Sequence, residues 1–367
     1  MSKYSTVIRK DDSGGISAAV KLLSAGEIVA IPTETVYGLA ANALNPAAIG
    51  KIFTAKGRPR DNPLIVHLTD LKMVREIGLD VTRLAEKLAE KFWPGPLTMI
   101  FRKTDIAFPL DIDESENAMT AAKPLSAAID GERSHGTCFH DYKTRYKTIP
   151  GEVSCGLDTV AVRVPGNTVM LEIIKRCNFP LAAPSANVSG SPSPTKAEHV
   201  FADLNGKIPL IIDGGDCEYG VESTVVAFDV DKIRILRPGA VTKEQLEKFA
   251  EVIIDGAVYN KTNGEKPVSP GTLHRHYSPK AEVIAVIADG EESFRNYVKA
   301  NGRDGDFTLS FSDYGDEGAS LLFAKLRELD GQGAERIFAR LPEPEGIGLA
   351  VYNRLIRAAD FNVVKAI

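Results

Sequence analysis

Residues 28–39 read IVAIPTETVYGL, a short apolar run that ends in a turn rich in hydroxyl groups. The apolar residues 28–31 predict a buried strand. The turn that follows places Thr33, Glu34 and Tyr37 between a proline and a glycine. Open α/β sheets bind their ligands at strand ends, so this turn is a candidate binding site. Taken alone, it is equally compatible with a turn whose Thr and Tyr side chains only satisfy backbone groups.

The surrounding sequence alternates strand-like and helix-like segments. Helices are predicted at 15–24 and 46–55, on either side of the opening strand, and the next strand at 63–68. The alternation continues with strands at 97–101, 160–164, 210–212, 224–228 and 233–236, and helices at 83–92, 169–177 and 196–204. This pattern predicts a large, twisted, mixed α/β sheet domain.

A second α/β pattern occupies residues 283–367, where strand and helix alternate three times and predict a small Rossmann-like parallel domain. The length of 367 residues also favours two domains. Residues 256–282 are rich in Gly, Pro and Ser and are interpreted as a linker or lid. Residues 104–148 have no clear period and are interpreted as an insertion in the first domain, which spans 1–255.

The composition excludes several classes of protein. Forty-four Lys plus Arg against 49 Asp plus Glu give a net charge of −5, which is not the charge of a polycation that coats nucleic acid. The longest apolar stretches have the length of strands, and the first residues lack the apolar core of a signal peptide, so we expect a cytoplasmic protein without membrane contact. The four cysteines form no CxxC pair, and no metal site is predicted.

The common nucleotide motifs, GxxxxGK[ST] and GxGxxG, are missing from the chain. Further polar segments instead lie at or after predicted strands or helices; one of them, DTVAVRVP, contains the predicted strand 160–164 itself. They are KGRPRDNP at 56–63, DTVAVRVP at 158–165, APSANVSGSPSP at 183–194, GVEST at 220–224 and LRPGA at 236–240. Two of these segments have a plain alternative: a solvated basic loop for the first and a flexible linker for the serine-rich one. His67, at the end of the strand 63–68, could equally be a core histidine.

In this order, the segments PTETVYGL, KGRPRDNPLIVH, DTVAVRVP, APSANVSGSPSPT, GVEST and LRPGA resemble the YrdC family. With the linker SPGTLHRHYSP at 269–279 and the small tail domain, the chain resembles the two-domain members of that family, the threonylcarbamoyl-AMP synthases. The resemblance implies a YrdC-like first domain. It also implies a reaction in which L-threonine, bicarbonate or CO2, and ATP give L-threonylcarbamoyl-AMP and pyrophosphate.

The resemblance also implies roles for individual residues. Threonine would be bound by Thr33, His67, Arg163, the backbone at Ala183, and Ser223, with Arg163 neutralising its carboxylate. ATP would be bound by Lys56, Arg60, Thr159, Ser185, Asn187, Ser193 and Arg237, with His276 and Tyr277 from the linker. Lys56 and Arg58 are the candidates for catalytic charge stabilisation. Because Lys56 is read as a cation on a Gly/Pro loop, its loss is expected to impair ATP use far more than folding.

The implied cofactor is Mg²⁺, bound with ATP and with few protein ligands. The implied partners are ATP, L-threonine and bicarbonate, and a tRNA threonylcarbamoyl transferase complex that takes the product; contact with tRNA or double-stranded RNA is a further option. Two alternatives stay open: an RNA-binding translation factor, which the net charge disfavours, and a carbamoyl-transfer maturation enzyme, whose zinc fingers the four scattered cysteines do not supply.

Overall fold

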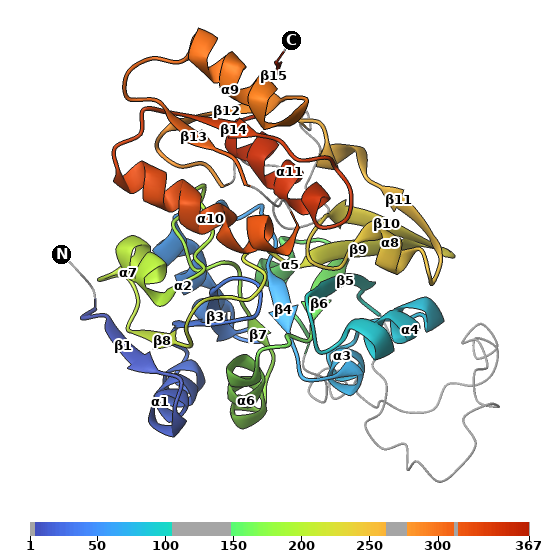
Figure 1. Cartoon of the computed structure of the whole chain (residues 1–367). Coiled ribbons are helices and arrows are strands. Elements are labelled where there is room, and N and C mark those ends of the chain that lie inside the picture. Colours follow the sequence, from blue (N-terminus) through green and yellow to red (C-terminus); the bar gives the residue numbers. More distant parts are fainter. Residues whose placement is uncertain (1–3, 105–147, 262–276, 312–314, 367) are drawn as a thin grey trace, which may run out of the picture.

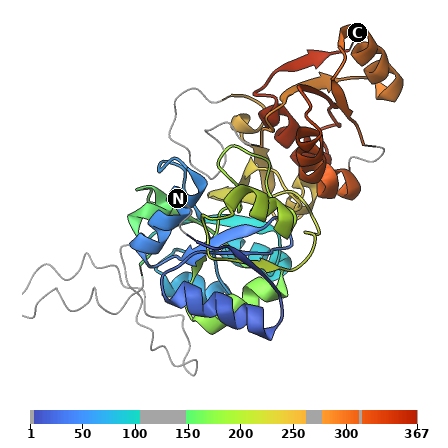
Figure 2. The ribbon, with the colours of Figure 1, turned by 90° about the vertical axis from the view of Figure 1, so that its left-hand side faces the viewer.

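The computed structural model describes residues 4–104, 148–261, 277–311 and 315–366. Two α/β units lie one above the other in Figure 1, and Figure 2 shows the smaller one at one end of the molecule. The predicted division into a large mixed sheet and a small parallel sheet is confirmed. Most of the predicted insertion, residues 105–147, lies outside the described residues. Within the described part, no helix is both long and apolar enough to cross a membrane.

The large unit is built on an eleven-stranded sheet in the order β1-β8-β2-β3-β7-β4-β6-β5-β9-β10-β11. Its strands are β1 (Val7–Lys10), β2 (Val29–Ile31), β3 (Gly38–Asn42), β4 (Ile65–His67), β5 (Leu97–Arg102), β6 (Thr159–Arg163), β7 (Leu181–Ala182), β8 (Leu210–Asp213), β9 (Thr224–Asp229), β10 (Lys232–Arg237) and β11 (Glu251–Ile254). Sequence periodicity did not predict β1, β3 or β11, and placed only a short apolar strand at β7.

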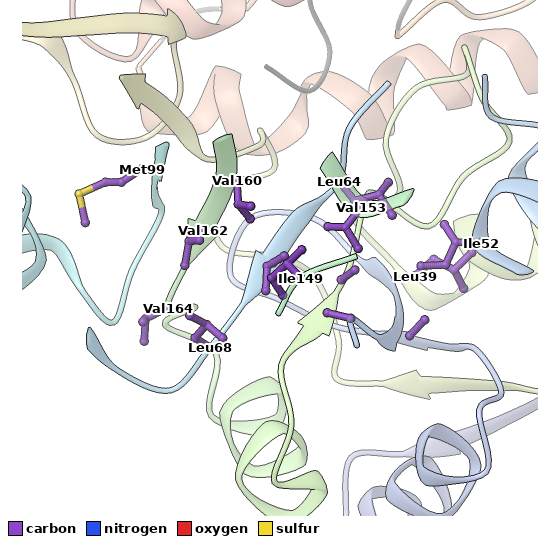
Figure 3. Close-up of a cluster of buried hydrophobic side chains, with 14 of the residues drawn as sticks. Leu39, Ile52, Leu64, Leu68, Met99, Ile149, Val153, Val160, Val162 and Val164 are labelled. Atoms are coloured by element: carbon purple, nitrogen blue, oxygen red, sulfur yellow. The ribbon is translucent and has the colours of Figure 1, made fainter. Parts of the chain in front are cut away.

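Helices cover both faces of this sheet. They are α1 (Ser13–Ser24), α2 (Pro46–Lys56), α3 (Leu71–Glu76), α4 (Arg83–Phe92), α5 (Gly151–Ser154), α6 (Thr168–Cys177), α7 (Ala197–Leu204) and α8 (Lys243–Leu246), followed by the 3-10 turn η2 (Gly256–Val258). Helices α1 and α6 pack together on one face with β2 and β8. The main core lies on the other face, where α2, α4, α5 and α7 contribute apolar side chains; Figure 3 shows part of it, with Ile52 and Val153 facing strand residues.

A side-chain cap fixes the start of helix α2, and a glycine fixes its end. Asn45 caps its N-terminus by accepting from the Ala47 and Ala48 N–H groups, and Pro46 occupies the first turn. Gly57 ends the helix with φ at 61°, a left-handed conformation that glycine adopts without strain. Lys56 is therefore the last residue of a helix instead of part of the basic loop that follows.

The small unit has four parallel strands in the order β13-β14-β12-β15. Its elements are β12 (Glu282–Ile287), α9 (Gly290–Asn301), β13 (Phe307–Leu309), α10 (Asp316–Gly331), β14 (Arg336–Arg340), α11 (Gly348–Ala358) and β15 (Val363–Lys365). In Figure 1, α10 and α11 lie between this sheet and the large unit. Valines 36 and 221 of the large unit are part of the small unit's core, so the two units share a packed boundary.

Candidate functional site

The polar turns converge because the strand order brings distant segments together. The turn 32–37 is the loop of a hairpin in which Ile31 pairs with Gly38. Gly38 forms a bridge to Ser185, and a Cβ on Gly38 would lie 3.2 Å from the Ala183 Cβ. Glycine at this position therefore allows the hairpin and the serine-rich segment to approach closely.

These segments enclose a cavity of about 70 Å³ at the boundary of the two units. Nine of the residues predicted for the site line it: Thr33, Arg58, His67, Arg163, Ala183, Ser185, Ser223, Arg237 and Tyr277. Most of the residues predicted for the site therefore lie together around one cavity.

Thr33 shapes the turn that forms one wall of the cavity. Its Oγ1 donates to the Val36 carbonyl at 2.6 Å and accepts from the N–H groups of Thr35 and Val36. The side chain thus fixes a compact turn, as the plain alternative expects. Thr33 also lines the cavity, so the turn that it fixes is part of the cavity wall.

Arg163, at the end of β6, is already paired within the protein. Its Nη2 lies 2.5 Å from Glu34 Oε1, and it donates to Thr35 Oγ1 at 2.8 Å and to Gly95 O at 3.1 Å. Burial would raise the pKa of Glu34, but Arg163 and a backbone N–H outweigh it and hold that pKa below its ordinary value. Glu34 is therefore ionised, and Arg163 forms an ion pair with it inside the protein.

His67, at the end of β4, lies beside Arg163 because the two residues are register partners in parallel strands. Burial, assisted by the nearby charge of Arg163, lowers the pKa of His67 to about 3. The imidazole is therefore neutral near pH 7. His67 Nδ1 is buried and has no hydrogen-bond partner among the described residues. Both His67 and Ile65, from the same strand, line the cavity.

Ser223 and Arg237 lie at the adjoining ends of β9 and β10, as predicted. Arg237 donates from Nη2 to the Ser223 carbonyl at 2.9 Å and to Ser223 Oγ at 3.1 Å. Ser223 Oγ is also 2.7 Å from Thr98 Oγ1. Burial lowers the pKa of Arg237, yet a guanidinium remains charged at neutral pH. Arg237 therefore supplies a fixed positive charge to the cavity.

Arg58 supplies a third positive charge. Its Nε donates to the Asn62 carbonyl at 3.1 Å and its Nη2 donates to the Pro63 carbonyl at 2.8 Å. Burial lowers the pKa of Arg58 to about 10, which leaves it charged near pH 7. These two bonds close the basic turn onto itself and hold the guanidinium at the cavity wall.

Lys56 does not line the cavity, and the expectation that it contributes little to folding is corrected by its burial. Only 2% of Lys56 is exposed. Its Nζ donates to the Ser185 carbonyl, to the Asn187 carbonyl at 2.7 Å and to Asn187 Oδ1 at 3.2 Å. Burial lowers the pKa of Lys56, although three oxygen acceptors favour the charged ammonium. Lys56 therefore holds the serine-rich segment 183–194 in place without lining the cavity itself.

Asn187 and Ser193 also lie behind the cavity wall. Asn187 accepts from Ser185 Oγ at 2.6 Å and donates to the Ser191 carbonyl at 2.8 Å. Ser193 Oγ donates to Glu222 Oε1 at 2.5 Å, and Glu222 itself lines the cavity. These side chains shape the segment 185–193 instead of facing the cavity.

Two further predicted site residues, Arg60 and Thr159, do not line the cavity. Arg60 is exposed, and its guanidinium lies 5.9 Å from the Phe53 ring centre beside other surface hollows. Thr159 begins β6 and lines a separate hollow with Asp158 and Phe228. It lies about 13 Å from Arg163, because a five-residue strand rises about 3.3 Å per residue. His276 lies outside the described residues.

Sequence reasoning missed Glu222 and Arg354 as parts of this site. Glu222 lies within the quoted GVEST motif, where an acid at the start of an apolar strand was an available signal. Arg354 lies on the amphipathic helix α11, where a charged residue is expected to face solvent. Nothing in the local sequence indicates that this arginine is buried.

The described residues contain no cluster of three or more His, Cys, Asp or Glu side chains placed to hold a metal ion. The one carboxylate that lines the cavity, Glu222, already bonds to Ser193 and to Arg354. The remaining charged lining groups are arginines 58, 163 and 237, which suit phosphate oxygens. This donor set fits a divalent ion only as a companion of bound phosphates.

Comparison with known proteins identifies the family to which the chain belongs. Residues 21–125 and 140–239 match the Sua5–YciO–YrdC family model, described as telomere recombination. Residues 241–360 match the model described as the C-terminal domain of threonylcarbamoyl-AMP synthase. The chain therefore belongs to the Sua5–YciO–YrdC family and has the two-domain form of the threonylcarbamoyl-AMP synthases.

Individual relatives extend over nearly the whole chain. The threonylcarbamoyl-AMP synthase of Pyrococcus abyssi is 37% identical, with 95% of each chain covered, and that of Bacillus subtilis is 36% identical, with 95% of this chain and 94% of the relative covered. A crystal structure of P. abyssi Sua5 complexed with L-threonine superposes with a TM-score of 0.79 at 35% identity and covers 98% of both chains. A variant of the same protein gives 0.82, covering 99% of this chain and 98% of the other.

Proposed function

We propose that this protein is an L-threonylcarbamoyladenylate synthase, which converts L-threonine, bicarbonate or CO2, and ATP into L-threonylcarbamoyl-AMP and pyrophosphate. The observation that carries the proposal is the convergence of arginines 58, 163 and 237 on one cavity that is also lined by Thr33, His67 and Ile65. Cationic groups suit phosphates and a carboxylate, and the small apolar surface suits the threonine methyl group. The full-length relatives named for this activity support the proposal.

The threonine end of the site is assigned to Thr33, His67, Arg163, the Ala183 backbone and Ser223. Arg163 lines the cavity and can pair with the carboxylate of a zwitterionic ligand, while its ion pair with Glu34 fixes the position of its guanidinium. Neutral His67 adds a hydrogen-bonding nitrogen without adding charge. The P. abyssi Sua5 structure with L-threonine supports a threonine site in this fold.

The nucleotide end is assigned to Arg58, Arg237, Ser185 and Tyr277 at the cavity, and to Lys56, Asn187 and Ser193 through the segment that they brace. Arg60, Thr159 and His276 remain candidates for ATP contact outside the described cavity wall. A cavity of about 70 Å³ is smaller than the roughly 300–1,000 Å³ of ordinary ligand sites. We infer that the cavity widens when ATP enters.

The chemistry needs no protein nucleophile. The threonine amine attacks CO2 and forms a carbamate after losing a proton; a carbamate oxygen then attacks the α-phosphorus of ATP, and the bond to the pyrophosphate oxygen breaks. Fixed arginines 58 and 237 stabilise the negative charge that shifts to the leaving group. The cavity also holds the reactants in line, which supplies much of the acceleration.

A divalent ion, Mg²⁺, would enter with ATP, bound mainly through phosphate oxygens, and would further neutralise their charge. We also propose that the adenylate passes to a tRNA threonylcarbamoyl transferase complex, with direct contact to tRNA as an option. The part of the chain that the structure describes offers no specific observation in favour of a translation factor or of a carbamoyl-transfer maturation enzyme.

The deciding experiment measures pyrophosphate release from ATP with and without L-threonine and bicarbonate. The proposal expects release only when both are present, together with a product that contains threonine, carbamoyl and AMP groups by mass spectrometry. Equal release without the amino acid would contradict it. RNA binding that weakens steeply with salt, without threonine-dependent turnover, would favour the translation factor.

A further inference from the structure

The small C-terminal unit contacts the large unit beside the cavity. Figure 1 shows α10 and α11 on the side of the small sheet that faces the large unit. Gly220 approaches α10 so closely that a Cβ on it would lie 2.3 Å from the Ser320 carbonyl oxygen. The cavity residues Val36 and Tyr277 are also buried in the core of the small unit. The two units are therefore in direct contact at the site.

Arg354 on α11 joins three segments of the site. It is completely buried, with 0% of its surface exposed. Its Nε donates to Glu222 Oε2 at 2.9 Å and its Nη1 donates to the Pro238 carbonyl at 2.8 Å. Its guanidinium carbon lies 5.3 Å from the centre of the Tyr277 ring. One side chain of the C-terminal unit thus contacts the GVEST turn, the LRPGA turn and the end of the linker.

If Glu222 were not paired, its negative charge would weaken ATP binding. Its carboxylate lines the cavity beside Arg237, where negatively charged phosphates are proposed to bind. Burial would raise the pKa of Glu222, but Arg354 and Arg237 outweigh this and hold the pKa below its ordinary value, so the group is ionised. An ionised, unpaired carboxylate would repel phosphate oxygens in this low-dielectric environment.

We propose that Arg354 is a positioning residue for ATP binding: it cancels the charge of Glu222 from behind the cavity wall and holds Glu222, Pro238 and Tyr277 in place. The inference rests on the proposed function, because it takes ATP as the ligand. It assigns to the C-terminal unit a part in the ATP site of the same chain, without contact between Arg354 and the reacting atoms.

A second arginine of the small unit, Arg327, holds the serine-rich segment in place through hydrogen bonds. Arg327 on α10 donates to the Pro192 carbonyl at 2.5 Å and pairs with Asp203 at 2.8 Å. Asp203 Oδ2 in turn accepts from the Val188 N–H at 3.2 Å. The serine-rich segment is thus fixed from the C-terminal unit as well as by Lys56.

The test is a double-mutant cycle on the full chain. Its variants are Arg354→Met, Glu222→Gln and the double variant, and Arg336→Met is the control. Arg336 pairs with Asp306 inside the small unit, away from the cavity. The dissociation constant of ATP is measured by titration calorimetry, and the melting temperature of each variant is recorded.

The charge argument expects Arg354→Met to weaken ATP binding roughly tenfold, equivalent to about 1.4 kcal/mol. Adding Glu222→Gln should restore most of the affinity, because the neutral amide oxygen still accepts from Ser193 while the repelling charge is gone. A role limited to stability would not predict this rescue. The control should bind ATP like the parent chain.

The inference is overturned if Arg354→Met binds ATP as the parent does, or if the double variant binds no better than Arg354→Met. If Arg354→Met alone fails to fold, the double variant decides, because it leaves no unpaired buried charge at this pair: the inference expects it to bind ATP nearly as well as the parent, and a tenfold loss contradicts it. Threonine-dependent pyrophosphate release by the parent tests the proposed function separately. A parent chain that binds no ATP refutes both.

Discussion

Lys56→Met tests whether a buried ammonium holds the serine-rich segment in place. Methionine keeps most of the apolar stem but removes Nζ, which donates to the carbonyls of Ser185 and Asn187. Each buried carbonyl left without its donor costs roughly 1–3 kcal/mol. We expect a total loss of about 3 kcal/mol in the free energy of unfolding, and a melting temperature lower by roughly 6–12 °C at about 2–4 °C per kcal/mol.

ATP use should fall together with stability, because Ser185 lines the cavity. We expect kcat/KM for ATP to fall by about 100-fold, the scale for losing one positioned polar group at a reacting phosphate. The assays are thermal unfolding and pyrophosphate release at varied ATP. Lys51→Met is the matched control: Lys51 lies on the same helix and bonds to Gly26 and Glu27, away from the cavity. If Lys56→Met melts within about 2 °C of the parent and its ATP kinetics are unchanged, the reasoning is refuted.

Three further predictions concern the threonine end, its titration and the insertion. Arg163→Ala should raise KM for threonine by roughly tenfold or more with little change in KM for ATP; a rise confined to ATP would show that the site is divided incorrectly. The pKa of His67 is about 3 in the folded protein and about 6.5 in the unfolded chain, so this group should remove about 2 kcal/mol of the parent's stability between pH 7 and pH 5. Urea unfolding of His67→Gln should show a loss smaller by that amount, and a pH profile identical to the parent's would contradict the burial argument. Replacing residues 105–147 by a short Gly/Ser bridge should leave a folded, active enzyme. The reason is that Lys103 bonds to Ser154 and to the Asp158 carbonyl and so holds the flanks of the segment together. Insoluble or inactive protein would show that the segment is structural or catalytic.

The sequence by itself determined the two α/β units and the main strand-end turns. Apolar runs of strand length and the chemistry of Gly, Pro and hydroxyl residues are local properties, and they predict elements such as β4 and the turn after β2. Motif order was sufficient to identify the family and to place Arg163, His67 and Arg237 at one site.

Only the tertiary structure decided which side chains meet. Arg354 and Glu222 are 132 residues apart and become partners through packing of the two units, so no local pattern predicts their contact. The pairing of Arg163 with Glu34 and the burial of Lys56 likewise depend on neighbours from turns far away in the sequence. Charged residues in a sequence look alike whether they face water or a buried acceptor, because burial is a property of the assembled sheet and not of the residue.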